Sequence, residues 1–172
     1  LRPELVEQVV AGVAATTGFR EVFLDEAGGR SVPVLRPVTP QPGQVPLSAA
    51  DVLLVTGGGR GITAECAYAL ASDTGARLAI LGRSDPASQP ELAANLARMR
   101  QAGITLHYVR ADVTDPAAVR AAVAEAAATL GPITAVLHGA GDNQPAALTS
   151  LDAAAVRRAL APKLDGLSAV LD

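Results

Sequence analysis

A glycine-rich run near the middle of the chain is the segment best suited to chemistry. It consists of Thr56, Gly57, Gly58, Gly59, Arg60, Gly61 and Ile62, between an apolar stretch and an alanine-rich stretch. A pyrophosphate needs free backbone amides and the positive end of a helix dipole, and glycines let a backbone turn tightly and approach the phosphates. Because a strand is expected before the run and a helix after it, the run predicts a dinucleotide-binding loop rather than a turn without a ligand.

The residues after the second predicted strand bear on which nicotinamide cofactor fits this loop. A carboxylate there binds the ribose 2′-hydroxyl of NAD, whereas a cation accommodates the 2′-phosphate of NADP. Arg83 and Ser84 occupy these positions, and Arg60 adds a second positive charge. Asp85 has the contrary sign, and we interpret it as a turn or cap residue. The pattern favours NADPH, and a solvated surface arginine is the alternative interpretation of Arg83.

The elements that must position these residues alternate regularly from Asp51 onward. Short apolar runs predict strands at residues 52–55, 78–81, 105–109 and 133–137, and three-to-four spacing predicts helices at residues 62–72, 90–102, 116–130 and 151–171. Such alternation requires parallel strands with right-handed crossovers, so we expect an α/β fold with a Rossmann-type doubly wound parallel sheet. We expect it to be truncated after the fourth strand and the following helix. Gly103 and Gly131 are predicted to end helices, and Asp115 to cap one.

The first part of the chain follows a different pattern. Residues 2–16 place apolar side chains on one helical stripe, and residues 20–24 and 30–35 predict a short hairpin. Four prolines between Pro37 and Pro46 indicate a linker. We therefore expect a small α+β segment with its linker at residues 1–46 and a nucleotide-binding domain at residues 47–172.

The composition argues against several classes of function. The 14 basic and 17 acidic residues give a net charge of −3, which offers no broad positive surface to nucleic acid or to a membrane. Cys66 is the single cysteine, so we expect no disulfide framework, no metal site and a reducing, cytoplasmic location. No stretch approaches the roughly 20 apolar residues that span a bilayer. We predict that Cys66 packs in the core with Ile62 and Leu70 rather than acting as a nucleophile.

The glycine-rich run resembles the fingerprint of the short-chain dehydrogenase/reductase family. That fingerprint is Thr-Gly-x-x-x-Gly-x-Gly, which Thr56, Gly57 and Gly61 match, whereas Thr63 replaces the last glycine. Because that glycine permits close packing, the replacement implies slightly altered packing around an intact phosphate-facing loop. Residues 56–67 look most like the ketoreductases of iterative synthases, of the enediyne and polyunsaturated-fatty-acid types. Residues 1–46 resemble the tail of the structural subdomain that precedes such ketoreductases.

This resemblance implies roles for further residues. By the family pattern, Asp112 accepts a hydrogen bond from the adenine amino group and Val113 packs on the ring. The segment His138, Gly139, Ala140 and Gly141 is similar to the family segment that lines the cofactor ribose, and we interpret His138 as a packed scaffold residue rather than a general base. Lys163, the single lysine, lies where synthase ketoreductases supply their catalytic lysine. That lysine would orient the nicotinamide ribose and lower the pKa of a tyrosine acid.

The family's catalytic serine and tyrosine are expected on the strand and helix that would follow Asp172. We predict that Tyr68 and Tyr108 cannot substitute, because one lies in the first helix of the sheet domain and the other in its third strand, far from the crevice at the carboxyl ends of the strands. The segment alone is therefore expected to be inactive.

The resemblance implies NADPH-dependent reduction of a β-keto acyl thioester on an acyl carrier protein, with neighbouring synthase domains as partners. Two alternatives stay open on the sequence. One is a free-standing reductase of small carbonyl compounds, and the other is a non-catalytic structural domain of a synthase.

Overall fold

The structure, a computed structural model, describes residues 2–39, 43 and 45–172. The chain divides into two compact units, Leu1–Gly43 and Gln44–Asp172. The predicted linker at residues 37–46 contains no helix or strand at its described positions, and residues 40–42 and 44 lie outside the described residues. None of the described helices has the length and hydropathy needed to cross a membrane.

The first unit contains one helix and one small hairpin. Helix α1 (Pro3–Ala14) is followed by β1 (Phe23–Leu24) and β2 (Arg30–Ser31), which pair antiparallel. The predicted helix and hairpin are present, but the strands are shorter than expected. The Asp25 carboxylate accepts hydrogen bonds from the amides of Ala27 and Gly29, which forms the turn. Pro33 has no N–H to extend the ladder.

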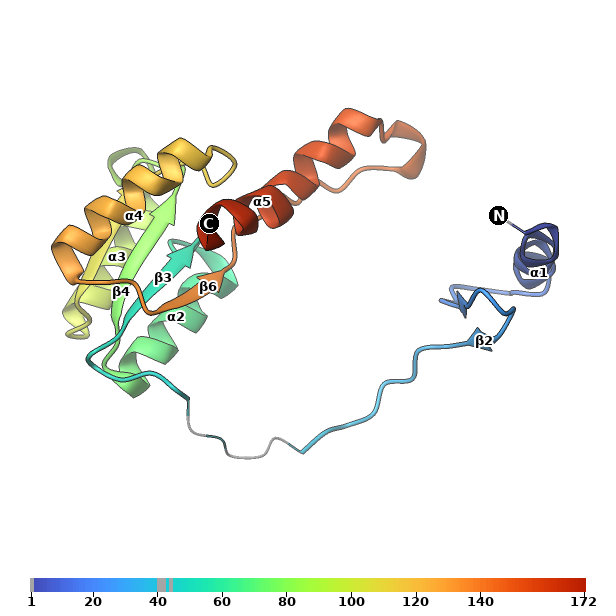
Figure 1. Cartoon of the computed structure of the whole chain (residues 1–172), viewed down its shortest axis with the longest axis horizontal. Coiled ribbons are helices and arrows are strands. Elements are labelled where there is room, and N and C mark those ends of the chain that lie inside the picture. The colour runs from blue at the N-terminus through green and yellow to red at the C-terminus, as the bar shows by residue number, and fades with distance from the viewer. Residues whose placement is uncertain (1, 40–42, 44) are drawn as a thin grey trace. The chain divides into compact units, whose positions relative to one another are not determined.

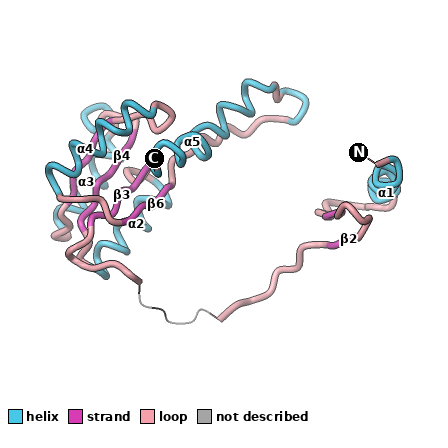
Figure 2. Tube along the Cα trace, in the orientation of Figure 1, coloured by secondary structure: helices cyan, strands magenta, loops and turns pink. Residues whose placement is uncertain are grey.

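The second unit is built on a four-stranded parallel sheet. Its strands and the helices around them can be followed in Figures 1 and 2. Its strands are β3 (Val52–Thr56), β4 (Arg77–Gly82), β5 (Leu106–Arg110) and β6 (Ala135–His138), in the order β5-β4-β3-β6. All three pairings are parallel, with Thr56 opposite both Leu81 and His138. The predicted Rossmann-type arrangement is confirmed. The third and fourth strands begin one and two residues later than expected, and the two central strands are more deeply buried than the two outer ones.

Four helices cover the two faces of the sheet. Helices α2 (Gly61–Thr74) and α3 (Pro90–Gln101) pack with Leu53 and Val55 of β3 on one face. Helices α4 (Pro116–Leu130) and α5 (Ala153–Leu171) lie on the other, where α4 packs with Val52 and Leu54. Successive side chains of a strand point to opposite faces, so β3 contributes to both cores. Two short 3₁₀ helices, η1 (Pro86–Ser88) and η2 (Leu148–Ser150), lie in the loops after β4 and β6.

The predicted helix ends are present. Asp115 caps α4 by accepting hydrogen bonds from the amides of Ala117 and Ala118 at 2.9 and 3.2 Å. Gly103 follows α3 and Gly131 follows α4, both with positive φ (83° and 99°), a conformation that glycine adopts without steric penalty. These ends fix where each loop starts at the edges of the sheet.

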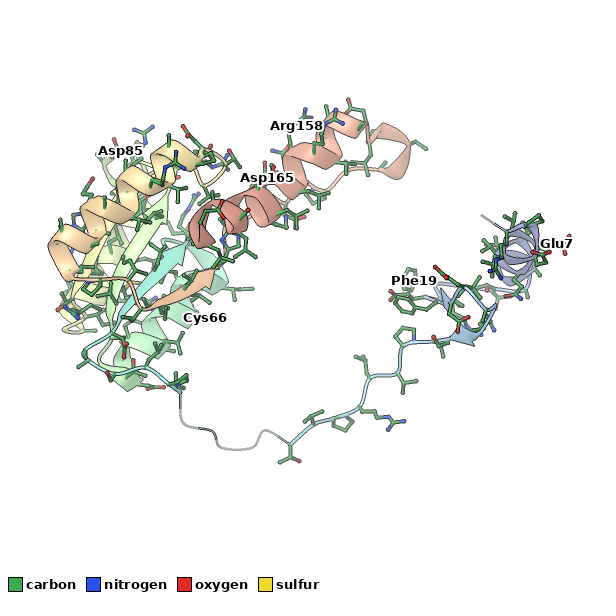
Figure 3. The ribbon with its side chains drawn as sticks, viewed as in Figure 1. Glu7, Phe19, Cys66, Asp85, Arg158 and Asp165 are labelled. Carbon is green, nitrogen blue, oxygen red and sulfur yellow. The ribbon has the colours of Figure 1, made fainter. Side chains whose placement is uncertain are left out.

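The prediction that Cys66 packs in the core is wrong. Cys66 is exposed on α2, where Figure 3 labels it, and Ile62 is 84% exposed. The face of α2 that meets the sheet consists of Ala64, Ala67 and Ala71, which are all buried. Small side chains let the helix lie close to the strands, so the larger apolar residues of α2 are not those that define its inner face.

Candidate functional site

A cleft of about 290 Å³ opens at the carboxyl ends of the four strands. The order of the strands changes direction between β3 and β6, and ligands of open α/β sheets bind in the crevice at such a point. Ten of the residues that the sequence assigned to the cofactor line the cleft: Gly57, Gly59, Arg60, Arg83, Ser84, Asp112, Val113, Gly139, Ala140 and Gly141. The topology therefore brings together segments from four separate loops.

The glycine loop forms the floor of the cleft between β3 and α2. Gly57 has a φ of 69°, and a Cβ there would approach the carbonyl oxygen of Gly139 to 2.8 Å. A Cβ on Gly59 would fall inside van der Waals contact of the Leu92 side chain. Arg60 is the N-cap residue of α2, but its side chain makes no capping hydrogen bond. The amides in the first turn of α2 therefore receive no hydrogen bond from this side chain. The loop has the close packing and the helix terminus that a pyrophosphate site requires.

Two arginines border the cleft. Arg60 donates a hydrogen bond from Nη1 to Oε1 of Gln89 at 3.2 Å. Arg83 is exposed directly after β4, and its carbonyl oxygen accepts a hydrogen bond from Nε of Arg110 at 3.0 Å. Asp85 caps η1 by accepting a hydrogen bond from the Ala87 amide at 2.8 Å, so its interpretation as a cap residue is confirmed (Figure 3). This end of the cleft carries the charge that suits a phosphate.

Tyr108 lines the cleft, contrary to the prediction that it lies far from the crevice. Its hydroxyl donates a hydrogen bond of 2.6 Å to the carbonyl oxygen of Ser84. A Cβ added to Gly82 would come within 2.8 Å of the same hydroxyl oxygen. Strand side chains lean along the strand, which carries this long side chain toward the carboxyl edge. Burial raises the pKa of Tyr108, so the phenol stays a hydrogen-bond donor. Tyr68 instead packs on α2 under the guanidinium of Arg98.

Asp112 and Val113 follow β5 on the same side of the cleft. The Asp112 carboxylate accepts hydrogen bonds from the Thr114 amide at 2.9 Å and the Thr114 hydroxyl at 2.8 Å. Burial alone would raise the pKa of Asp112, but these hydrogen bonds and the charge of Arg83 outweigh it and lower the pKa below its usual value. The carboxylate is therefore ionised at neutral pH and available as an acceptor.

His138 is a hydrogen-bonded scaffold residue, as predicted. Its Nδ1 lies 2.8 Å from the Thr56 hydroxyl oxygen, and its Nε2 lies 3.0 Å from the carbonyl oxygen of Pro162. Lys163 follows on α5, and its Nζ donates hydrogen bonds to the carbonyl oxygens of Asp142 and Ala159. The ammonium lies beside Gly141, where an added Cβ would be 3.7 Å from Nζ. Lys163 thus borders the end of the cleft formed by residues 139–141.

The remaining predicted residues do not line the cleft in the described part of the chain: Thr56, Gly58, Gly61, Ile62, His138 and Lys163. The sequence also missed several residues that do, among them Thr63, Tyr108 and Pro162. The side chain of Thr63 occupies the space that a Cβ on Gly139 would need. The missing glycine of the fingerprint was the signal that could have drawn attention to Thr63. No cluster of three metal-ligating side chains occurs within residues 2–39, 43 and 45–172.

Three solved structures share this arrangement. A ketoreductase from the macrolactin assembly line aligns with a TM-score of 0.67 and 25% identity, over 83% of this chain and 28% of that one. A short-chain dehydrogenase from Burkholderia cenocepacia, solved in complex with NADP, aligns with a TM-score of 0.62 and 30% identity. The alignment covers 71% of this chain and 48% of that one. A blue fluorescent protein from a metagenomic library, solved in complex with NADPH, aligns with a TM-score of 0.61 and 29% identity. The alignment covers 70% of this chain and 48% of that one.

Two of the sequence relatives are polyketide synthases, and this chain spans only a few per cent of their length. Polyketide synthase ThaG of Burkholderia thailandensis is 38% identical over 133 residues, which are 76% of this chain and 2% of that protein. Polyketide synthase PksM of Bacillus subtilis is 29% identical over 141 residues, 82% of this chain and 3% of that protein. The family model described as the KR domain matches residues 52–172. The chain therefore belongs to the KR domain family, the ketoreductases within the short-chain dehydrogenase/reductase superfamily.

Proposed function

We propose that the cleft holds NADPH for the reduction of a β-keto acyl thioester carried on an acyl carrier protein. The observation that carries this proposal is the convergence of the glycine loop, the two arginines and Lys163 around one cleft at the carboxyl edge of the sheet. Neighbouring structures solved with NADPH or NADP support the cofactor class. When bound, NADPH supplies the hydride that converts the keto carbon to an alcohol carbon.

The residues present fit the pyrophosphate and the adenosine end of this cofactor. The amides at the start of α2 and the space left by Gly57 and Gly59 suit the pyrophosphate. Arg83 pairs with the 2′-phosphate, and Arg60 adds its charge at the same end. Asp112 accepts from the adenine amino group, while Val113 packs on the ring.

Lys163 acts at the opposite end of the cleft. Its ammonium, held by the carbonyl oxygens of Asp142 and Ala159, lies beside the loop of residues 139–141. There it orients the nicotinamide ribose and lowers the pKa of a tyrosine that donates the proton to the reduced carbonyl oxygen. The serine and tyrosine belong to the strand and helix that follow this segment in the family pattern, so the segment alone binds NADPH without turning over.

An activity assay tests the proposal. A chain extended through the expected serine and tyrosine should oxidise NADPH in the presence of a small β-keto thioester. Replacement of Lys163 by alanine should lower turnover by about 10²-fold, the scale of one group in acid catalysis, and leave the melting temperature unchanged because the side chain is exposed. Arg157→Ala, an exposed change on the same helix, is the control.

The outcomes separate the alternatives. NADPH binding without any reduction would contradict the catalytic role and favour a structural domain. Reduction of small carbonyl compounds alone, with thioesters ignored, would contradict the synthase substrate. If Lys163→Ala kept nearly wild-type turnover, Lys163 would be a surface charge without a catalytic role.

Two finer assignments belong to the same proposal. The match of residues 56–67 to iterative synthases of the enediyne and polyunsaturated-fatty-acid types supports that synthase type for the parent protein. The single cysteine and the synthase relatives support a cytoplasmic location among neighbouring synthase domains.

A further inference from the structure

A continuous chain of hydrogen bonds links the centre of the sheet to helix α5. It starts at Thr56, which ends β3 and is completely buried. The Thr56 hydroxyl oxygen lies 2.8 Å from Nδ1 of His138, at the end of β6. Nε2 of the same imidazole lies 3.0 Å from the carbonyl oxygen of Pro162. Three elements are therefore connected through one histidine.

The Pro162 carbonyl decides the direction of one hydrogen bond in this chain. The Pro162 carbonyl can only accept, so Nε2 of His138 carries the hydrogen. When the ring carries this one hydrogen, Nδ1 is an acceptor and the Thr56 hydroxyl donates to it. The Thr56 oxygen in turn accepts from the amides of Gly139 and Ala140, each at 3.3 Å. Both imidazole nitrogens are engaged, so His138 has no nitrogen left for a substrate proton.

The bond to Pro162 joins α5 to the end of β6. Proline inside a helix removes one amide and opens the preceding turn, and Pro162 is buried within α5. One turn later, a Cβ on Gly166 would lie 2.8 Å from Val113 and 3.5 Å from the His138 ring. The helix therefore approaches the strand ends closely at this point. Lys163 directly follows the anchored proline, and its ammonium lies beside Gly141.

We propose that His138 is a positioning residue for the nicotinamide end of the cleft. Through the hydrogen on Nε2, it holds the Pro162 carbonyl and thereby the position of Lys163. Through the Thr56 hydroxyl it also orients the Ala140 amide, whereas the Gly139 amide donates in addition to the Thr56 backbone carbonyl at 3.0 Å. The inference rests on the proposed function, because it assigns these groups to the nicotinamide half of NADPH.

Two carboxamide variants separate the two imidazole nitrogens. Glutamine has an amide nitrogen at the same number of bonds from Cα as Nε2, so His138→Gln keeps a donor for Pro162. Asparagine has its carbonyl oxygen at the level of Nδ1, so His138→Asn keeps the acceptor for Thr56 and loses the donor. The dissociation constants of the 172-residue chain are measured for NADPH and for adenosine 2′,5′-bisphosphate, which has only the adenine half.

His138→Asn should weaken NADPH by about fivefold or more, the scale of one hydrogen bond, and leave the bisphosphate within about twofold. His138→Gln should recover most of the NADPH affinity. Equal losses in both variants, or an equal loss of the bisphosphate, would show a merely structural residue and overturn the proposal.

The tautomer is measured on the same wild-type sample by imidazole ¹⁵N NMR. Hydrogen on Nε2 alone is expected, and hydrogen on Nδ1 would overturn the proposal whatever the cofactor does. A wild-type chain that bound neither ligand would overturn the proposed function and the role of His138 toward the cofactor. The ¹⁵N spectrum would then still decide whether the hydrogen-bond chain exists.

Discussion

The positive charge around this cleft comes from a few individual residues. In the proposed binding mode, Arg60 and Arg83 lie at the adenosine end of the cleft and Lys163 borders the nicotinamide end. Arg60 is tethered to Gln89, while the side chain of Arg83 projects from the loop after β4. Of the two arginines, Arg83 therefore has the greater freedom to pair with a 2′-phosphate.

Replacing Arg83 with alanine should change cofactor preference more than cofactor binding in general. Loss of a charged hydrogen-bond partner should weaken NADPH by about tenfold or more, and NADH, which lacks the 2′-phosphate, by no more than about twofold. Fluorescence titration with both cofactors measures the two affinities. The exposed Arg120 on α4 provides the control, since Arg120→Ala should alter neither. If Arg83→Ala lost equal affinity for NADPH and NADH, Arg83 would not be the residue that binds the 2′-phosphate.

At the scale of elements, the alternation of strands and helices was predictable because each has a strong periodic signal. Helix α4 begins and ends at its predicted residues. The bounds of the other strands and α-helices in the second unit lie within two residues of their predicted positions. The inner face of α2 was not predictable, because alanines rather than large apolar residues form it. Contacts between loops distant in sequence, such as Tyr108 with Ser84, depend on side-chain reach that a one-dimensional pattern does not contain.

The contact between α2 and the loop after β6 gives a test at this scale. A Cβ on Gly139 would overlap the Thr63 side chain, so Gly139→Ala should destabilise the fold by about 1–3 kcal/mol through overpacking. Thr63→Gly alone should cost only about 0.3–0.5 kcal/mol in helix propensity, because threonine is itself a weaker helix former than alanine. The double variant, which restores the last glycine of the family fingerprint, should be more stable than the two single effects predict. Urea unfolding measures the coupling, and strict additivity would contradict this packing.

At the scale of the whole molecule, the two units differ in how they are held together. The second unit has buried clusters on both faces of its sheet, whereas no residue of α1 is buried. Among the described residues, β6 pairs with β3 alone, so its other side presents unpaired backbone groups. Edges of this kind favour pairing with a second chain.

The 172-residue chain should therefore self-associate at high concentration through β6. Val136, on this strand, is 38% exposed, and Val136→Lys should reduce association because an edge lysine opposes strand pairing. Val156→Lys, at a comparably exposed position on α5, should leave association unchanged. Sedimentation velocity measures both, and a monomeric wild-type chain at all concentrations would refute an associating edge.

The central claim is that one cleft at the carboxyl edge of the sheet binds NADPH. An NADPH titration of the ¹⁵N-labelled 172-residue chain, followed by amide correlation spectra, tests it most directly. Saturable shifts should concentrate at residues 57–62, 83–84, 112–113 and 139–141, with little change at the opposite edge around Gly75 and Gly103. Absence of saturable shifts, or shifts concentrated at that opposite edge, would contradict the account.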